Sequence, residues 1–597
     1  MSGIAGIIKT DGNIDISEKE FNTFFGCILV NNCTEKVVTR INTSGFVGLG
    51  ELAGKTPKVL CSKNEMIKIF VWGELFFRNS LECESSKSEI LFEKWDKQQE
   101  KFVDNITGNF VIFIFDKKRG YYLFNSLFGM MPIYYSLKGS LLYFSSRIQS
   151  FIDLNSFVSE IDKSSLLQYL IFNYSINDST YLKDVKLLPA ASIIKTENGR
   201  WKLNKYNNHL WLLNSPTLDL KKGKKLVSDA LERAIIRITS IDKPFGCSIT
   251  GGWDGRLVLS YLTKNKKLDY FLYTYGKDNN LDMNIARKLK TKFGFKHIPV
   301  LLDQEFINSY GELATETSYL SGATRAANRG HYILMAKILS QKTRMVISGN
   351  CGSNILKIIQ GSSSVYNEHV LNLFKGDLYF EDALKKIYFD FFSKNPWVKR
   401  FISFDHFCDS LYNNEIIHDK SVSLAYRFYH YLLTNIERKY FGSETASYSS
   451  YIYNYSPFID AEFIETIINT PFYGGHYTFL EKNPFVRIQL IKLYAEIMVI
   501  NNSELARFTS DRGFPISWFL NPLGRVAGLL IKKMNTISKK GFDPDPFNHV
   551  KALNKLNNSY CLADEFFINN ENQKINDTLI NALSWSNWYS KYLINKS

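Results

Sequence analysis

The sequence predicts an α+β part rich in strands, then an α/β part built on a parallel sheet, and finally a helical extension. Three observations support this. Short apolar runs separated by turn signals fill the first two hundred residues, which is typical of antiparallel hairpins. Strand-like and helical patterns alternate from residue 222 to about 348, which is typical of βαβ units. The length of 597 residues exceeds what one hydrophobic core supports, so at least two domains are expected.

Two hairpins and a helix are predicted in the first part. The apolar run at 111–115 is followed by the turn Asp-Lys-Lys-Arg-Gly and a second apolar run at 121–124. Runs at 132–136 and 141–145 flank a Leu-Lys-Gly-Ser turn, which predicts a second hairpin. A helix is expected over 163–173, and the polar stretch 207–216 is typical of a linker.

Strands and helices alternate in the second part. Leu226, Ala230 and Leu231 are spaced for one face of a helix. The predicted order is helix 222–239, strand 244–249, helix 257–262, strand 270–275, helix 283–293, strand 297–302, helix 327–340 and strand 344–348. Strands joined through helices in this way run parallel. From about residue 354 the chain is rich in aromatic residues, and a mostly helical extension is expected.

Composition excludes several classes of protein. Hydrophobic residues make up 45% and charged residues 22%, which is enough apolar side chain to fold and excludes a disordered chain. The formal charge of +15 comes from lysines spread along the chain, with the densest runs at 221–225 and 264–267. A diffuse excess is typical of a solvated surface, so no nucleic-acid partner is expected.

Cysteine usage and the N-terminus favour a cytoplasmic protein. None of the 8 cysteines forms a CxxC pair or a metal-type spacing with histidine, which favours reduced thiols. The first residues lack the basic start and apolar stretch of a signal peptide. No apolar run approaches the ~18 residues of a membrane span, so no membrane partner is expected.

The segment after the strand at 244–249 carries the chemistry. It reads Ser248-Ile249-Thr250-Gly251-Gly252-Trp253-Asp254-Gly255-Arg256 and leads into a helix. Consecutive glycines let the backbone approach a phosphate, and the helix directs free N–H groups and its positive dipole end at the anion. Asp254 suits such a loop if Mg²⁺ lies between carboxylate and phosphates, and Arg256 could add a charge-assisted contact. A Gly-Gly turn that enters a helix, with Asp254 as a dipole partner, is the structural alternative.

A second loop of small residues follows the strand at 344–348. It reads Ser348-Gly349-Asn350-Cys351-Gly352-Ser353-Asn354. Two such loops at the carboxyl ends of strands in one sheet form a nucleotide crevice.

Further segments complete an ordered pattern. They are Ser2-Gly3-Ile4-Ala5-Gly6, Gly73-Glu74-Leu75, Gly108-Asn109-Phe110, the run Phe-Gly-Met-Met-Pro-Ile-Tyr-Tyr at 128–135, Leu187-Leu188-Pro189-Ala190 and Ser456-Pro457-Phe458-Ile459-Asp460. With the two loops, they resemble the asparagine synthetase superfamily over nearly the whole chain. The resemblance implies an N-terminal nucleophile (Ntn) hydrolase-like, glutaminase-like domain at 1–205 and a linker at 206–222. It implies an α/β adenine nucleotide hydrolase-like (PP-loop) synthetase domain at 223–597.

The resemblance also implies a site for ATP and Mg²⁺. ATP would be held by Ser248, Thr250, Gly251, Gly252, Trp253, Asp254, Gly255, Thr274, Gly276, Ser348 and Gly349. Asp254 and Ser353 would hold Mg²⁺, and Asp254 and Arg256 would take part in catalysis. The family's later catalytic lysine has two candidate counterparts, Arg487 and Lys492.

Departures from the family pattern limit what the chain can do. Ser2 stands where the family has a nucleophilic cysteine, and a hydroxyl is the weaker nucleophile even when its own amine activates it. Trp72 replaces the usual Asn or Asp of the glutamine pocket. Ser353 and Asn354 replace an Asp-Glu pair, which weakens Mg²⁺ binding. We therefore expect glutaminase activity to be lost.

The leading hypothesis is an ATP-dependent, AMP-forming amide ligase. It would activate a small-molecule or peptide carboxylate as an acyl adenylate for attack by ammonia or a substrate amine. Peptide macrocyclisation, sugar-acid amidation and asparagine synthesis all remain open. A non-catalytic scaffold or regulator is the first alternative, supported by the missing thiol and acidic pair. The second alternative is a basic nucleic-acid binder, which predicts steeply salt-dependent binding to DNA or RNA. The sequence does not indicate an oligomeric state.

Overall fold

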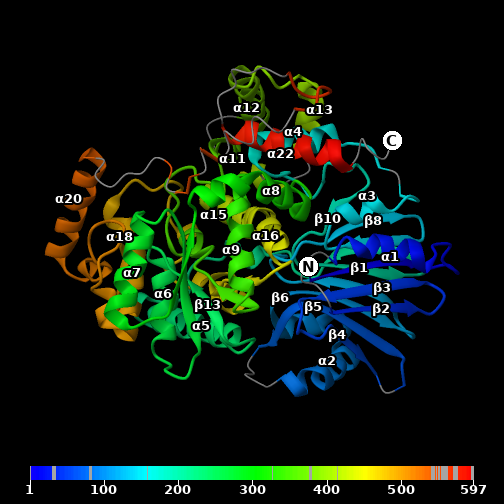
Figure 1. The fold of residues 1–597 in the computed structure, drawn as a ribbon, viewed down its shortest axis with the longest axis horizontal. Helices are drawn as coiled ribbons and strands as arrows, with labels where there is room; N and C mark the ends of the chain where they lie inside the picture. The colour runs from blue at the N-terminus through cyan, green and yellow to red at the C-terminus, as the bar shows by residue number, and fades with distance from the viewer. Residues whose placement is uncertain are drawn as a thin grey trace.

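The computed structural model contains three β-sheets surrounded by helices. Two six-stranded sheets lie within the first 205 residues, and a five-stranded sheet lies between residues 245 and 455. Figure 1 shows the first two sheets on the right, the third to the left of centre, and a group of helices above them. The structure describes residues 2–29, 35–62, 64–78, 84–157, 159–325, 327–375, 379–412, 415–538, 545, 547–548, 551–552, 562–568 and 576–592.

The first two sheets are antiparallel and pack face to face. The first has the order β10 (Lys186–Leu187), β8 (Tyr134–Lys138), β9 (Leu141–Ser145), β1 (Gly3–Lys9), β3 (Gly45–Glu51) and β2 (Glu35–Ile41). The second has the order β12 (Arg200–Lys205), β11 (Ser192–Glu197), β7 (Gly120–Asn125), β6 (Ile106–Asp116), β5 (Ile67–Phe77) and β4 (Lys58–Cys61). Ile4, Val47 and Phe113 belong to the apolar layer between them.

Helices cover the outer faces of this sandwich. Phenylalanines of α1 (Glu18–Gly26) pack with Phe46 of β3 and with Phe151 of α3 (Gln149–Asp153). Trp95 of α2 (Glu84–Gln98) packs on the second sheet. The 3₁₀ turn η1 (Gln99–Asn105) follows α2 in the chain. The layers helix, sheet, sheet and helix fit an amidotransferase-like domain of the Ntn class.

Both predicted hairpins are confirmed. β6 and β7 pair across residues 116–120, and β8 and β9 pair across 138–141. The predicted helix is α4 (Lys163–Phe172), which Asp162 caps and which ends where Asn173 adopts a φ of 72°. The predicted linker contains the 3₁₀ turn η2 (Leu210–Leu213), in which Leu212 is fully buried.

The third sheet is parallel, as predicted. Its order is β15 (His297–Leu301), β14 (Tyr270–Gly276), β13 (Phe245–Ser248), β16 (Met345–Ile347) and β17 (Tyr453–Tyr455). The predicted helices are α5 (Leu220–Thr239), α6 (Asp254–Leu262), α7 (Leu281–Phe293), and η3 (Ala327–Arg329) with α9 (Gly330–Ser340). Helix α8 (Gln304–Ser321) and strand β17 were not predicted.

The extension is mostly helical. Its elements are α10 (Gly352–Leu356), α11 (Glu368–Phe374), α12 (Phe380–Lys394), α13 (Phe404–Tyr412), α14 (Glu415–His418), α15 (Leu424–Tyr431), η4 (Leu432–Ile436), α16 (Glu437–Tyr448), η5 (Pro457–Ile459), α17 (Ala461–Ile468), η6 (Gly474–His476), α18 (Pro484–Asn501), α19 (Ser503–Ala506), η7 (Ile516–Leu520), α20 (Pro522–Ser538) and α22 (Asp577–Tyr592). None of the helices in the described ranges is long and apolar enough to cross a membrane.

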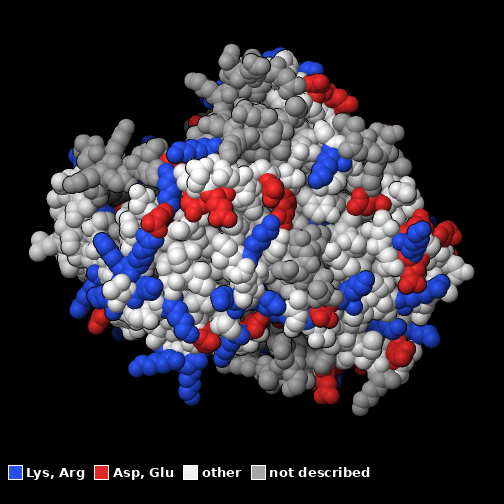
Figure 2. Space-filling model, in the orientation of Figure 1, with Lys and Arg blue, Asp and Glu red and all other residues white. Residues whose placement is uncertain are grey.

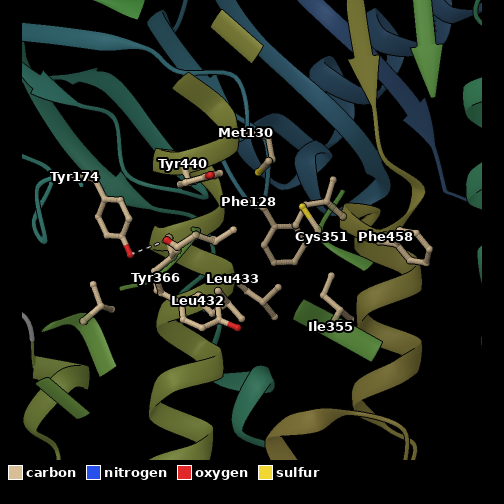
Figure 3. Close-up of a cluster of buried hydrophobic side chains, with 14 of the residues drawn as sticks. Phe128, Met130, Tyr174, Cys351, Ile355, Tyr366, Leu432, Leu433, Tyr440 and Phe458 are labelled. Atoms are coloured by element: carbon tan, nitrogen blue, oxygen red, sulfur yellow. Dashed lines mark hydrogen bonds between the residues drawn. The ribbon is translucent and has the colours of Figure 1, made fainter. Parts of the chain in front are cut away.

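One hydrophobic core joins the sandwich to the parallel-sheet part. Figure 3 shows Phe128 and Met130, from the segment after β7, near Cys351, Ile355, Leu432 and Leu433. Ion pairs add to the contact, because Arg78 Nη1 lies 2.6 Å from a carboxylate oxygen of Glu465. The two parts are therefore packed against each other through buried apolar side chains.

Charged side chains of both signs are scattered over the surface. Figure 2 shows Lys and Arg interspersed with Asp and Glu on the face it displays, with many basic side chains at the lower left. Several surface lysines are paired with carboxylates, such as Lys264 with Glu232 at 2.5 Å. On this face the charge distribution is the diffuse one that the sequence indicates.

Candidate active site

The two predicted loops meet where the order of the parallel sheet reverses. Loop 1 (248–255) follows β13 and loop 2 (348–354) follows β16, and these strands are neighbours. The chain builds β14 and β15 on one side of β13, then returns to build β16 and β17 on the other. Ligands bind in the crevice at such a switch point, outside the carboxyl ends of the strands.

The loops touch at backbone distance. A Cβ added to Gly349 would lie 2.7 Å from the nitrogen of Gly255 and 2.9 Å from the carbonyl carbon of Asp254. A Cβ on Gly255 would lie 2.7 Å from the carbonyl oxygen of Ser248. Glycine at 349 therefore lets loop 2 approach loop 1, whereas glycine at 255 lets the first turn of α6 lie against the start of its own loop.

Loop 1 is held in place by side chains from outside it. The N–H of Gly251 donates to Oδ1 of Asp282 at 2.7 Å, and the Thr274 hydroxyl donates to the Ile249 carbonyl at 2.6 Å. Trp253 is the N-cap residue of α6 and makes no side-chain cap hydrogen bond, so its side chain satisfies none of the free amides in the first turn of α6. Within loop 1, the N–H of Gly252 donates a hydrogen bond to the hydroxyl oxygen of Thr250 at 3.2 Å.

Asp254 is the centre of a polar cluster. The Nζ of Lys357 lies 2.9 and 3.1 Å from its two carboxylate oxygens, and the Tyr494 hydroxyl donates to Oδ1 at 2.6 Å. The Ser353 hydroxyl donates to Oδ2, and Lys357 Nζ donates to that hydroxyl at 2.6 Å. Burial raises the pKa of Asp254, but Lys357 and the two hydroxyls lower it more, so the pKa lies below its ordinary value. Asp254 is therefore a carboxylate.

These residues do not fit a divalent cation. Asp254 and Ser353 were predicted to share Mg²⁺, yet an ammonium group lies within about 3 Å of the same oxygens and would repel a second cation. Asn354 is directed elsewhere, because its amide donates to Glu437 at 2.7 Å. Within the part of the chain that the structure describes, no group of three or more His, Cys, Asp or Glu side chains is placed to hold a metal ion. In this structure the Lys357 ammonium thus lies where the prediction places Mg²⁺, beside Asp254 and Ser353.

Arg256 also has a different role from the one predicted. Its side chain is buried, and its guanidinium donates to the carbonyl oxygens of Phe508 and Thr509 at 3.0 and 2.9 Å. Burial lowers its pKa to about 10, although the carboxylates of Asp511 and Asp282 favour the charged form. Arg256 follows Asp254 by two residues, which places it about 200° around the helix, away from the Asp254 side. It anchors the 508–511 segment instead of reaching a phosphate.

The two candidates for the catalytic cation lie on α18 with Tyr494. Arg487 precedes Tyr494 by seven residues, so it shares the same face, about 10 Å away along the axis. Lys492 precedes Tyr494 by two residues and so belongs to the opposite side of the helix. Lys357 was not predicted as a site residue. It follows Ser353 by four residues but is the C-cap of α10 with an extended backbone, so no local pattern indicates that it meets Asp254.

The remaining residues predicted to contact the nucleotide lie in and around the two loops. Trp253 is buried, and the guanidinium of Arg512 lies 4.1 Å from the centre of its ring. Gly276 has a φ of 148°, and a Cβ there would overlap the Asn280 side chain. The Ser348 hydroxyl is buried without a hydrogen-bond partner at the start of loop 2.

Ser2 is enclosed. It is fully buried at the start of β1, and Nε1 of Trp72 donates to its hydroxyl at 3.2 Å. A nearby cavity of about 480 Å³ is bordered by Glu51, Lys58 and Glu74, but Ser2 is not among its lining residues. Lys58 Nζ lies 2.6 Å from Glu74, so this acidic group is neutralised within the chain.

Known proteins match the chain in the same two parts. The family model for a glutamine amidotransferase domain matches residues 71–207, and the model for asparagine synthase matches residues 226–473. Asparagine synthetase [glutamine-hydrolyzing] 1 of Bacillus subtilis is 24% identical over 229 residues, which is 37% of this chain and 35% of the relative. Asparagine synthetase [glutamine-hydrolyzing] 2 of Arabidopsis thaliana is 22% identical over 293 residues, 47% of this chain and 44% of the relative.

The chain thus spans about a third to a half of the length of these relatives. Among solved structures, glutamine phosphoribosylpyrophosphate amidotransferase from B. subtilis, complexed with ADP and GMP, matches with a TM-score of 0.24 and 8% identity. That match covers 50% of this chain and 65% of the other. With both family models matched in order on one chain, this protein belongs to the asparagine synthetase superfamily.

Proposed function

We propose that this chain is an ATP-dependent carbon–nitrogen ligase of the asparagine synthetase type. The observation that carries the proposal is the meeting of loops 1 and 2 at the switch point, with the Asp254 carboxylate between them. Residues 1–205 would form the Ntn-like domain, and residues 223–597 a synthetase domain of the PP-loop type. ATP would bind with its phosphates toward the first turn of α6.

In the proposed reaction a carboxylate oxygen of the substrate attacks the α-phosphorus of ATP. The bond from that phosphorus to the bridging oxygen breaks, pyrophosphate leaves, and an acyl adenylate forms. Ammonia or a substrate amine then attacks the acyl carbon, loses a proton, and releases AMP. Backbone amides of α6 and of Gly349 would hold the phosphates, and the Lys357 ammonium would offset their charge.

The N-terminal domain would not supply ammonia from glutamine. Trp72 covers the Ser2 hydroxyl, and that hydroxyl is a weaker nucleophile than a thiol. Lys58 neutralises Glu74, one of the residues that resemble the family's glutamine pocket. The nitrogen would therefore come from free ammonia or from an amine of the substrate itself.

A screen for pyrophosphate release tests the proposal. The full chain is incubated with ATP, ammonium and one carboxylate at a time, from aspartate, sugar acids and leader-bearing peptides. Release that needs a carboxylate and disappears in Asp254→Asn supports the ligase. Asp15→Asn is the matched control, because the side chain of Asp15 is 93% exposed on the far domain.

A nucleotide-binding scaffold or regulator is the second candidate. The observation that favours it is the ion pair between Asp254 and Lys357, which leaves the site without a free carboxylate. It predicts that ATP binds but that no carboxylate releases pyrophosphate. The same screen, run beside a binding measurement, separates the two functions.

A further inference from the structure

The candidate site holds a cation that belongs to the chain itself. We propose that the Lys357 ammonium takes the place of the divalent metal ion in this crevice, so that a nucleoside polyphosphate binds there without a metal on Asp254. This inference rests on the proposed binding of ATP. It concerns only what balances the charge between the carboxylate and the phosphates.

The charge of Asp254 makes some cation necessary. A carboxylate at the start of α6 would repel phosphates that approach the same helix turn, because like charges at short range oppose each other. Lys357 Nζ lies within 3.1 Å of both carboxylate oxygens, so the pair together carries no net charge. A phosphate can then approach the helix N-terminus without meeting an unbalanced anion.

Lys357 is fixed in this position but still accessible. Its ammonium donates to Ser353, four residues earlier on the same turn, and lies 5.2 Å from the centre of the Tyr494 ring. The side chains of Lys357 and Asp254 are each 21% exposed, so neither is sealed into the core. If Lys357 turns one donor toward a phosphate, Asp254 keeps its hydrogen bonds from Tyr494 and Ser353.

The oxygens that Mg²⁺ would need are already in use. Mg²⁺ requires near-octahedral oxygen ligands at about 2.0–2.1 Å. Loop 2 offers only the neutral Ser353, whose oxygen already accepts from Lys357, and Asn354, whose side-chain amide donates to Glu437 and so is held away from Asp254. A lysine is a compact point charge that binds phosphate well, so one fixed ammonium can replace part of what the ion supplies.

Calorimetric titration of the full chain with ATP tests this, once in EDTA and once in Mg²⁺. The expected dissociation constant in EDTA is within about threefold of that in Mg²⁺. Lys357→Met should weaken binding in EDTA by about tenfold or more, the loss expected for one charge-assisted hydrogen bond. Mg²⁺ should restore binding to Lys357→Met, because the freed Asp254 carboxylate can then hold the ion. Lys394→Met, at an exposed position of α12, is the matched control and should bind as the wild type does.

A double variant guards against loss of folding in Lys357→Met. Lys357→Met with Asp254→Asn removes both charges, and it should bind ATP weakly in EDTA with no recovery in Mg²⁺. Wild-type binding that appears only with Mg²⁺ would overturn the inference and leave the proposed function standing. Tighter binding by Lys357→Met in EDTA would also overturn it, since Lys357 would then be blocking the site. No binding of ATP under any condition would instead refute the proposed function.

Discussion

The contact between loops 1 and 2 makes Gly349 the position where the smallest change should have the largest effect. In Gly349→Ala the new Cβ would lie 2.7 Å from the Gly255 nitrogen, 2.9 Å from the Asp254 carbonyl carbon and 2.9 Å from the Asp254 Cβ. Two of these atoms are backbone in the first turn of α6, where Leu257 N–H already bonds to the Trp253 carbonyl at 2.8 Å. The loops must therefore separate, by roughly 0.7 Å to reach ordinary contact.

Overpacking of this kind costs about 1–3 kcal/mol in the free energy of unfolding. Urea unfolding should show that loss, and titration with ATP should show weaker binding, because the separation widens the crevice at Asp254. Gly311→Ala is the control. A Cβ there meets nothing within 4 Å in α8, so alanine should stabilise the chain by about 0.5–1 kcal/mol and leave ATP binding unchanged. If Gly349→Ala unfolded within about 0.5 kcal/mol of the wild type and bound ATP equally well, the close contact of the loops would be refuted.

Three further predictions concern other parts of the molecule. The purified protein should release no glutamate from glutamine, because Trp72 covers Ser2; glutamate release that Ser2→Ala abolishes would contradict this. Burial raises the pKa of Glu437 to about 7 from 4.5, so the folded state keeps a proton that the unfolded state gives up, and stability falls as pH rises between those values. Glu437→Gln should therefore raise Tm at about pH 8 and leave it nearly unchanged at about pH 5, and an equal change at both would argue against the assignment. Arg325 Nη2 and Glu444 Oε1 form a buried pair at 2.6 Å, so Glu444→Gln should lower the free energy of unfolding by about 3–5 kcal/mol, and a loss below about 1 kcal/mol would show that the pair contributes little.

Local patterns predicted most of the fold. The hairpin of β6 and β7 has a turn of three residues, and the alternation of strands and helices from α5 to β16, apart from α8, follows from apolar spacing. Strand β17 was missed because it has three residues and pairs with a strand more than a hundred residues earlier, inside a region with helical composition. Pairing at that distance depends on tertiary packing and leaves little trace in the sequence.

The candidate site was likewise predicted only in part from local patterns. Both loops could be predicted, since each follows a buried strand and is rich in glycine and other small residues. The ion pair between Asp254 and Lys357 could not be predicted. The two residues are 103 positions apart, and only the arrangement of β13 beside β16 brings them together. The role of Arg256 was predicted from its chemistry alone. The spacing of two residues on a helix turns Arg256 away from Asp254, and that spacing is sufficient to correct the prediction.

The products formed from ATP test the central claim most directly. The full chain is incubated with ATP, ammonium and the carboxylates of the screen, and nucleotides and phosphates are separated and quantified. The proposed ligase predicts AMP and pyrophosphate in equal amounts, formed only when a carboxylate is present and lost in Asp254→Asn. ADP and inorganic phosphate, or no turnover with any carboxylate while ATP remains bound, would contradict it.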